Sequence, residues 1–593
     1  MRGWASIWTA VCKIYCPSGA IYATTTCAER GKAQATFLGC PPHIGSEQDQ
    51  TGEDTMGDQR DESRLLLSRR NFLHATAGVA ASGALAEMLA ACGSSSSSNG
   101  SQAASNSVTT GPAKRGGTLS VAAGDAATSE NLDPQRTWNQ NHDFFYTPMV
   151  WETLVLCRQD WSLVPLLAKS WEPNTSSTVW TFHLRPGVKW HDGKPFTARD
   201  AAWSIKRLLN SKYGSPIYGV LSPVLHPSGI KVVDDHTLAL HLNYAHDLLP
   251  LTFAQAGTEM IQDGSDPTKY KVANAVGTGP FTIKSFVAGQ SWAVARNHGY
   301  WNKGLPYLDE IRGVAIPDPT GMVQAVSTGS SDVSTSINFS QVPTLSGTQA
   351  TAFRVAGSHD VYIAMDTRHK PFDDNRVRMA IKLAMDRKTI ISAAYGGEAI
   401  ATSDTPLPSS DSLYPRGLGV RAQNTAQAKK LLAQAGYSSG LQLQLYTSDL
   451  VGGMVDMATA FAQTVASAGI HVQITQHPAA TYFEQIWLQK PMYCSWISLR
   501  HPVLRVPMTM TTDAAWQETH MLHTPVDQLL KRAVSAHGQR QQQLIGQMLT
   551  WIADNQAYVC PAFPNWVFAT KQHVRGLQWW NMRALDFSRV SLA

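Results

Sequence analysis

The sequence predicts a mixed α/β protein whose folded body is divided into two lobes. The body runs from about Lys114 to Ala593, which is too long for one hydrophobic core. Its first half has the pattern of strands and hairpins with occasional helices, whereas its second half alternates strands with amphipathic helices. We therefore expect two lobes with different mixtures of strand and helix.

The composition is that of a globular protein without a nucleic-acid partner. The chain is 43% hydrophobic, 9% aromatic and 16% charged, and it holds 18 Trp. Few charges and many rings suit an extracytoplasmic domain with a ring-lined cleft. The formal net charge of +5 includes the N-terminal segments and says little about the body. Lysine and arginine are scattered, without the basic stripe that a phosphate backbone requires.

An export signal precedes the body. The segment SRRNFLH starts at Ser68 and carries Arg69 and Arg70, and an apolar stretch follows that ends in LAAC at Cys92. Such a stretch is too short to span a bilayer comfortably and is typical of a cleaved signal. The arginine pair is similar to a twin-arginine signal, and LAAC is similar to a bacterial lipobox, in which Cys92 takes a diacylglycerol. Acyl chains on one residue would hold a soluble domain at a membrane. The alternative is a buried helix with a chance RR pair and a chance cysteine.

The signal lies between a polar segment and an N-terminal leader. Residues 93–113 should form a flexible tether, because the stretch from Gly93 to Thr110 consists almost entirely of Ser, Gly, Asn, Ala and Gln. Residues 1–55 carry four cysteines without sustained periodicity, whereas residues 56–92 make an ordinary signal. We therefore expect the true start at Met56 and take residues 1–55 as a doubtful leader. The alternative is a small zinc or disulfide module, although the cysteine spacings match no finger pattern well.

Periodicity places the elements of the first half. Trp180, Phe182 and Leu184 alternate with polar residues, which predicts a half-buried strand. Thr197 with Asp200 forms a capping box that predicts a helix start. Residues 237–242 alternate again and predict a further strand.

In the second half, apolar residues repeat at helical spacing over 377–384 and 428–435. Asp374 and Asn424 are the expected N-caps, and Gly436 is a suitable C-terminal glycine. The stretches 441–446, 455–468 and 470–475 read as strand, helix and strand, which predicts parallel pairing.

The body contains Cys157, Cys494 and Cys560. An odd number of cysteines cannot all pair internally, so the fold is not a disulfide scaffold. Whether two of them pair stays open.

Seven blocks in the body occur in the order of a known family. The most specific block is WTFHLRPGVKWHDGKPFTARDAAWS from Trp180 to Ser204. The others include VGTGPF from Val276, RNHGYW from Arg296 and KPFDDNRVRMAIKLAMDR from Lys370. The body resembles family 5 of the bacterial extracellular solute-binding proteins, the oligopeptide-, dipeptide- and nickel-binding components of ABC importers.

This resemblance implies a two-lobed clamshell of the large, peptide-binding (class II, cluster C) type. Lobe I would comprise 114–358 and 562–593, and lobe II would comprise 359–561. A hinge crossed twice would let the lobes close on a ligand and present it to an ABC permease and ATPase complex. The protein would be a lipid-anchored monomer outside the cell membrane, with no catalytic residue, cofactor or metal.

The same resemblance suggests ligand-contacting residues. Peptide-binding members have an aspartate a few residues after a Trp of the second lobe, whereas the comparable stretch here, WISLRHP from Trp496, has Arg500 and no acid. A carboxylate or polyol ligand would suit that arginine. The candidates for the cleft are Trp138, Asn139, Asn338, Phe339, Trp496, Arg500, Trp516 and Glu518.

Other patterns have simpler explanations or belong to competing functions. His191-Asp192-Gly193 reads as a hairpin turn, and the pair His520 and His523 lacks further ligands for a metal. The main rival is an exported enzyme, although the body has no HExxH signature and no SxxK followed by SDN. Receptors for a glycan, a glutathione-like compound or a nickel chelate, and a receptor turned chaperone or sensor, also remain open.

Overall fold

The computed structural model describes residues 113–124, 128, 130–136, 145–582 and 584–593. The chain divides into Met1–Gly100 and Ser101–Ala593, and every described residue belongs to the second unit. The predicted leader, signal and lipidation site, with Arg69, Arg70 and Cys92, lie outside the described residues, as do Trp138 and Asn139.

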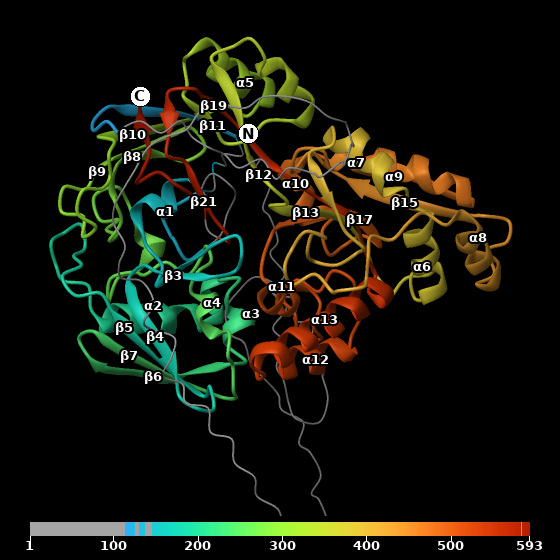
Figure 1. Cartoon of the computed structure of the whole chain (residues 1–593), viewed down its shortest axis with the longest axis horizontal. Helices are drawn as coiled ribbons and strands as arrows, with labels where there is room; N and C mark the ends of the chain where they lie inside the picture. The colour runs from blue at the N-terminus through green and yellow to red at the C-terminus, as the bar shows by residue number, and fades with distance from the viewer. Residues whose placement is uncertain (1–112, 125–127, 129, 137–144, 583) are drawn as a thin grey trace, which may run out of the picture. The chain divides into compact units, whose positions relative to one another are not determined.

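A seven-stranded sheet forms one part of the body, with strand order β12-β19-β11-β1-β10-β9-β8 (Figure 1). Strand β1 runs parallel to β10 and β11, and the other pairs are antiparallel. Helix α5 packs on this sheet through Met322, which contacts Ala122 of β1. The bounds are β1 Thr118–Ala123, β8 Phe281–Val287, β9 Ser291–Arg296, β10 Glu310–Ala315, α5 Pro319–Thr328, β11 Val333–Ser334, β12 Ala350–Val355 and β19 Trp566–Lys571.

A four-stranded antiparallel sheet follows, with order β4-β5-β7-β6. The predicted alternation is confirmed, because Trp180, Phe182 and Leu184 of β5 are buried. The capping box of α2 is confirmed as well, since the Thr197 N–H donates to Asp200 Oδ2 at 2.7 Å. The bounds are β4 Ala168–Pro173, β5 Val179–Leu184, α2 Ala198–Leu208, β6 Leu225–Asp234 and β7 Thr237–Leu242.

A six-stranded sheet with order β14-β18-β13-β17-β15-β16 forms the remainder of the core. The strand-helix-strand unit β15, α9, β16 is parallel as predicted, but β13 pairs antiparallel with β17 and β18. Asp374 and Asn424 cap α6 and α8 as expected. The bounds are β13 His359–Met365, α6 Asn375–Ala384, α7 Arg387–Tyr395, β14 Ala399–Ala401, α8 Thr425–Gln434, β15 Leu441–Thr447, α9 Met454–Val465, β16 Ile470–Gln476, β17 Met492–Ser498 and β18 Tyr558–Pro564.

The remaining elements are short or flank these sheets. Helices α10 Ala479–Gln485, α11 Pro502–Thr509, α12 Pro525–Val534 and α13 Gly538–Asn555 accompany the six-stranded sheet, and the short helices of the first half are α1 Thr147–Val150, α3 Tyr218–Leu221 and α4 Leu249–Thr252. The 3-10 helices are η2 Ser211–Tyr213, η3 Pro267–Lys269, η4 Phe339–Leu345 and η5 Ala466–Ala468. The small strand pairs use β2 Val155–Cys157, β3 Leu163–Pro165, β20 Val574–Arg575, β21 Gln578–Trp580, β22 Ala584–Asp586 and β23 Ser591–Leu592.

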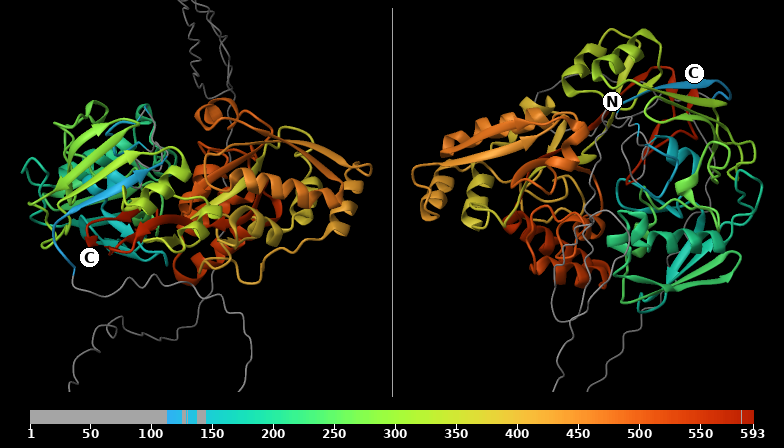
Figure 2. Two further views of the ribbon diagram at one scale, coloured as in Figure 1. Left: turned by 90° about the horizontal axis from the view of Figure 1, so that it is seen from above. Right: turned by 180° about the vertical axis from the view of Figure 1, so that it is seen from behind.

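The sheets define two lobes. The first lobe contains the seven- and four-stranded sheets, and the second contains the six-stranded sheet with its helices. In the part of the chain that the structure describes, the backbone crosses between them twice, after β12 and again at Asn565 between β18 and β19. Figure 2 shows the blue to yellow-green first lobe and the yellow to red second lobe from two further sides, with red C-terminal strands returning to the first lobe. The return crossing lies slightly after the predicted boundary at 561.

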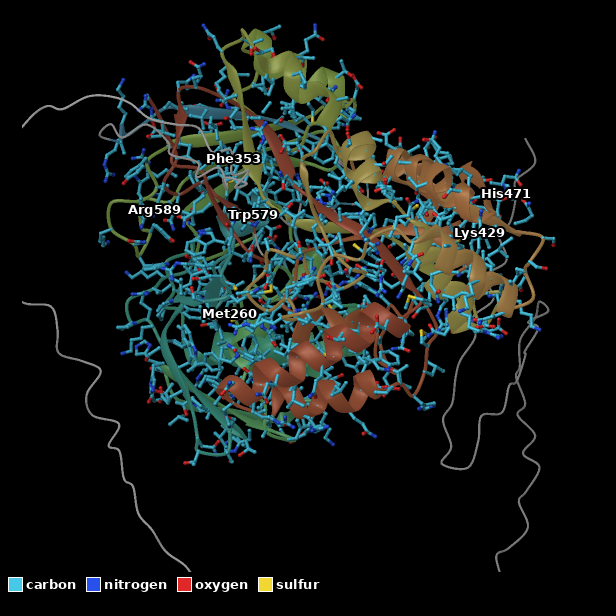
Figure 3. The ribbon with its side chains drawn as sticks, turned by 45° about the vertical axis from the view of Figure 1, so that its right-hand side comes forward. Met260, Phe353, Lys429, His471, Trp579 and Arg589 are labelled. Carbon is cyan, nitrogen blue, oxygen red and sulfur yellow. The ribbon has the colours of Figure 1, made fainter. Side chains whose placement is uncertain are left out.

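Figure 3 labels residues of both lobes. His471 of β16 and Lys429 of α8 lie at the outer end of the second lobe, away from Arg589. Phe353 of β12 and Trp579 of β21 lie in the first lobe, where both rings contact Phe568 of β19 at centroid distances of 6.0 and 6.3 Å.

Cys157, Cys494 and Cys560 are buried and unpaired with each other. Burial raises the pKa of the Cys157 and Cys494 thiols to about 12, so both stay protonated at neutral pH. Among the described residues, no helix is both long and apolar enough to cross a membrane.

Candidate functional site

A cleft of about 900 Å³ lies where the two lobes face each other near the chain crossings. Both lobes contribute to its walls. First-lobe residues come from the end of β1, from α5 and η4, and from β19, whereas second-lobe residues come from the start of β13, from α7, and from the loop before α9. A concave site of this size between two lobes is a suitable binding site for a small solute.

The first-lobe wall is formed by η4 and the residue before it. The Asn338 N–H donates to Gln341 Oε1 at 3.0 Å, which fixes the first turn of η4. Phe339 follows directly and is 9% exposed, with its ring in edge contact with Tyr395 of α7 at 5.4 Å. Asn338 and Phe339 therefore meet the second lobe at the cleft.

The second-lobe wall depends on two glycines before α9. Gly453 has φ +81, and a Cβ there would lie 2.6 Å from the Tyr395 ring. A Cβ on Gly452 would lie 3.3 Å from Asn338 Oδ1 of the first lobe. A Cβ would clash with Tyr395 at Gly453 and would crowd Asn338 at Gly452, so the two glycines let this loop approach both neighbours closely.

His359 and Trp566 form the inner surface of the cleft. The His359 side chain is 2% exposed, and its ring meets Trp566 at 5.3 Å and Trp496 at 6.3 Å. Its Nδ1 lies 3.2 Å from Ser358 Oγ, whereas no described residue is within hydrogen-bond distance of Nε2. Burial lowers the pKa of His359 to about 3, so the ring is neutral at physiological pH.

The two chain crossings are tied to each other beside this surface. Asn565 Oδ1 accepts from the Gly357 N–H at 3.0 Å, and Asn565 Nδ2 donates to Glu398 at 2.8 Å. Arg354 of the first lobe forms an ion pair with the same Glu398 at 2.7 Å. These contacts make a compact hinge region.

The lobes also touch at the end opposite the hinge, where α11 to α13 lie beside α3 and α4 (Figure 1). Trp161 Nε1 donates to Asp411 Oδ2 at 2.9 Å, and the Trp161 ring meets His501 at 5.2 Å. Arg500 Nη1 donates to Gln255 Oε1 at 2.9 Å. The larger apolar core continues from the four-stranded sheet into the second lobe. The structure therefore shows the two lobes in contact on both sides of the cleft.

Three further polar contacts complete this far side. The Asp247 N–H donates to the Val534 carbonyl at 2.6 Å, and Ser535 Oγ donates to the Ala245 carbonyl at 2.8 Å. His537 Nδ1 lies 2.7 Å from Asp247 Oδ1.

The structure brings only part of the predicted site together. Asn338 and Phe339 line the cleft. Trp496 lies behind it against His359, and Arg500 takes part in the far-side contact instead. The expectation of an anionic ligand was based on Arg500, and the described lining of the cleft does not include that residue.

Glu518 is buried inside the second lobe, and Trp516 is half-buried against the core of that lobe. Glu518 accepts hydrogen bonds from Tyr362 and Trp487, both at 2.6 Å, and burial raises the pKa of its carboxyl. Trp516 contacts the Trp487 ring at 6.0 Å. Both residues thus support the β13–β17 core, outside the described lining of the cleft.

Sequence reasoning missed His359, Trp566 and the glycine loop. Gly452-Gly453, between a strand and a helix, was a usable signal, because paired glycines at such a position often mark a close backbone approach. His359 and Trp566 carried no such signal, since the two residues are far apart in sequence and meet only across the crossings.

The histidine patterns have structural explanations. His191 Nδ1 accepts from the Gly277 N–H at 3.1 Å, and its Nε2 lies 3.0 Å from the Gly279 carbonyl oxygen. His191 therefore joins two turns of the first lobe. His520 Nδ1 lies 3.4 Å from Asp366 Oδ1. Within the described part of the chain, no group of three or more His, Cys, Asp or Glu side chains could hold a metal ion.

Comparisons with known proteins agree with this architecture. The family model "Bacterial extracellular solute-binding proteins, family 5 Middle" matches residues 162–505. Heme-binding protein A of Haemophilus influenzae is 29% identical over 396 residues, which is 61% of this chain and 69% of that protein. Glutathione-binding protein GsiB of Pectobacterium atrosepticum is 28% identical over 322 residues, 54% of this chain and 61% of the relative.

Among solved structures, the periplasmic binding protein DppA of Helicobacter pylori, in complex with the peptide STSA, has a similar fold. The TM-score is 0.70 at 23% identity, with 81% of this chain and 98% of that one covered. The likeness shows the fold, a mixed α/β clamshell with two lobes.

Proposed function

Because the chain belongs to family 5 of the bacterial extracellular solute-binding proteins, we propose that it captures a small peptide or similar solute between its lobes and delivers it to an ABC permease. The ATPase of the importer would then drive transport. The receptor would act as a monomer and return its ligand chemically unchanged.

The cleft is the observation that carries this proposal. Its walls come from both lobes, and within the described residues the chain crosses the hinge region beside it at two places. A ligand that contacts both walls favours the closed arrangement over an open one, because it binds the closed form more tightly. Closure around a solute is thus a direct consequence of where the cleft lies.

The relatives support a small organic ligand without specifying which. Their names refer to heme and glutathione, and the related structure is a complex with the peptide STSA. We propose that Asn338 and Phe339 contact the solute, since both line the cleft from the first lobe. Receptors of this fold for a glycan or a nickel chelate are the alternatives.

The binding function can be tested with protein stripped of ligand by unfolding and refolding. We expect small peptides to raise its melting temperature, since a ligand that binds only the folded state stabilises it. Mass spectrometry should recover the ligand intact. Turnover of the ligand would support an exported enzyme instead, and a stripped protein that no small peptide stabilises would contradict peptide capture.

The location is a proposal that rests on the N-terminal sequence. Arg69 and Arg70 would direct export, and Cys92 would carry the lipid that holds the protein at the outer face of a membrane. We expect Cys92→Ser to release the protein into the soluble fraction without a change in its binding constant. Continued membrane retention of the variant would place the anchor elsewhere.

A further inference from the structure

We infer that the cleft selects a solute carrying a positive charge, which Asp449 and Asp456 attract and which His359 meets at the inner surface. This inference rests on the proposed function and names the class of solute. It follows from the charges of the lining, from one unpartnered buried side chain and from the rings around it.

The charged residues of the lining are all acidic. Among the described residues that line the cleft, Asp449, Asp456 and Glu398 carry charge, and none is a lysine or an arginine. Glu398 is compensated by Arg354. Asp449 and Asp456 are exposed, and neither forms an ion pair within the described part of the chain. Two uncompensated carboxylates on one wall favour a cation in the cleft.

The N-terminus of a helix beside the cleft carries partial positive charge, which disfavours a cation, but its effect is weaker than that of the two carboxylates. Helix α9 begins at Met454 beside the cleft, and a helix N-terminus carries about half a positive charge. Asp456 lies in the first turn of α9 and offsets that partial charge. With Asp449 added, the wall remains negative.

His359 gives this acidic cleft a defined contact point. The side chain is 2% exposed and lines the cleft, and its Nε2 has no hydrogen-bond partner among the described residues. A buried polar atom without a partner costs free energy unless a ligand or water satisfies it. Because the ring is neutral, it does not repel a cation.

The aromatic residues of the cleft are compatible with the same ligand class. Phe339 and Trp566 line it from the first lobe, and the faces of such rings attract cations. An anionic solute would find no cationic side chain in the described lining. A cationic group is therefore favoured by the carboxylates, and no described lining residue is a lysine or an arginine that would repel it.

The test uses three tripeptides that differ only in the charge of the central side chain: Gly-Lys-Gly, Gly-Gln-Gly and Gly-Glu-Gly. Binding of each peptide to the full-length protein, stripped of bound ligand by unfolding and refolding, is measured by calorimetry at low and at high salt. We expect Gly-Lys-Gly to bind about tenfold more tightly than Gly-Glu-Gly at low salt, with Gly-Gln-Gly between them and a smaller ratio at high salt.

The matched variants are Asp449→Asn with Asp456→Asn, and Asp513→Asn as a control on an exposed acid outside the cleft lining. The double variant should bring the Lys-to-Glu ratio close to one, and the control should leave it unchanged. Equal affinity of the folded protein for all three peptides, or a ratio that the double variant does not alter, would overturn the inference and leave peptide capture intact. Binding of none of the peptides would overturn the proposed peptide capture and this inference with it.

Discussion

On the hinge side the lobes are joined by the chain itself, whereas on the far side they are joined by side chains and a few backbone hydrogen bonds. Gly357 and Asn565 belong to the two crossings and are linked by a hydrogen bond of 3.0 Å. Trp161 and Asp411 meet across the far side with no covalent link. The hinge must persist in every conformation, so entry of a solute requires the far-side contacts to open.

The two regions also differ in backbone strain. Gly357 has φ +54, a conformation that glycine adopts readily. Trp161 has φ +66, which is unfavourable for a bulky residue. The contacts of Trp161 must outweigh that strain in the closed form.

The largest expected effect comes from removing the main far-side ring. Trp161→Ala should lower the free energy of unfolding by about 3 kcal/mol, because the ring is 9% exposed and contacts His501. Urea unfolding measures this loss, and small-angle scattering should show a larger radius of gyration. Trp161→Phe keeps a ring without the donor to Asp411 and should lose only about 1 kcal/mol. Equal losses for both variants would show that the hydrogen bond, not the ring, joins the lobes.

The next effect tests the hinge. Gly357→Ala should cost about 2 kcal/mol, because its Cβ would lie 3.1 Å from Ile400 Cδ1 and φ is +54. Gly396→Ala is the matched control, since Gly396 has φ +56 with nothing within 4 Å of its Cβ. The control should cost only about 1 kcal/mol. If the two variants are equally stable in urea, crowding at the hinge has no energetic role.

The stability of the protein should depend on pH through one histidine on the hinge side of the cleft and one on the far side. Burial lowers the pKa of His359 and of His501 to about 3, so both rings are neutral in the folded protein. In the unfolded chain these two rings bind protons below about pH 6.5, whereas in the folded protein they do not. The free energy of unfolding therefore falls as the pH is lowered from about 6.5 toward 3. At pH 5.5, each of the two histidines should lower the free energy of unfolding by about 1 kcal/mol relative to its value at pH 7.5.

His501→Asn tests the far-side share, because Asn can replace the acceptor that the Val503 N–H uses at 3.3 Å. Urea unfolding at pH 7.5 and 5.5 should show a smaller pH-dependent loss for this variant than for the unaltered protein. An unchanged difference between the two pH values would mean that His501 is protonated in the folded state.

The smallest effect is expected for the exposed far-side pair. His537 and Asp247 lie 2.7 Å apart with side-chain exposures of 57% and 23%. Because solvent screens such pairs, His537→Gln should change the free energy of unfolding by no more than about 0.5 kcal/mol. A loss comparable to that of Trp161→Ala would reverse the ranking of the far-side contacts.

Local structure followed from short sequence patterns. The capping box at Thr197 and the alternation at Trp180 to Leu184 appear as expected, because such signals depend on neighbours within a few residues. The antiparallel pairing of β13 with β17 and β18 was not anticipated. It joins strands separated by long stretches of chain, for which no local pattern exists.

The candidate site likewise contains residues that the sequence identified and residues whose position only the structure shows. Asn338 and Phe339 were identified from the family resemblance and lie in the cleft, whereas Glu518 is enclosed by Tyr362 and Trp487. A glutamate in a sequence shows its charge but not its neighbours. Whether it faces a ligand or the core depends on packing.

By itself, the sequence determined the family, the mixture of strands and helices, and the caps that begin several helices, because these depend on local spacing and hydrogen bonding. The tertiary structure alone decided the lining of the cleft, the burial of His359 and the contact between Trp161 and Asp411. These features arise where residues from different lobes meet, and the free energy of such contacts depends on distances that no single stretch of sequence encodes.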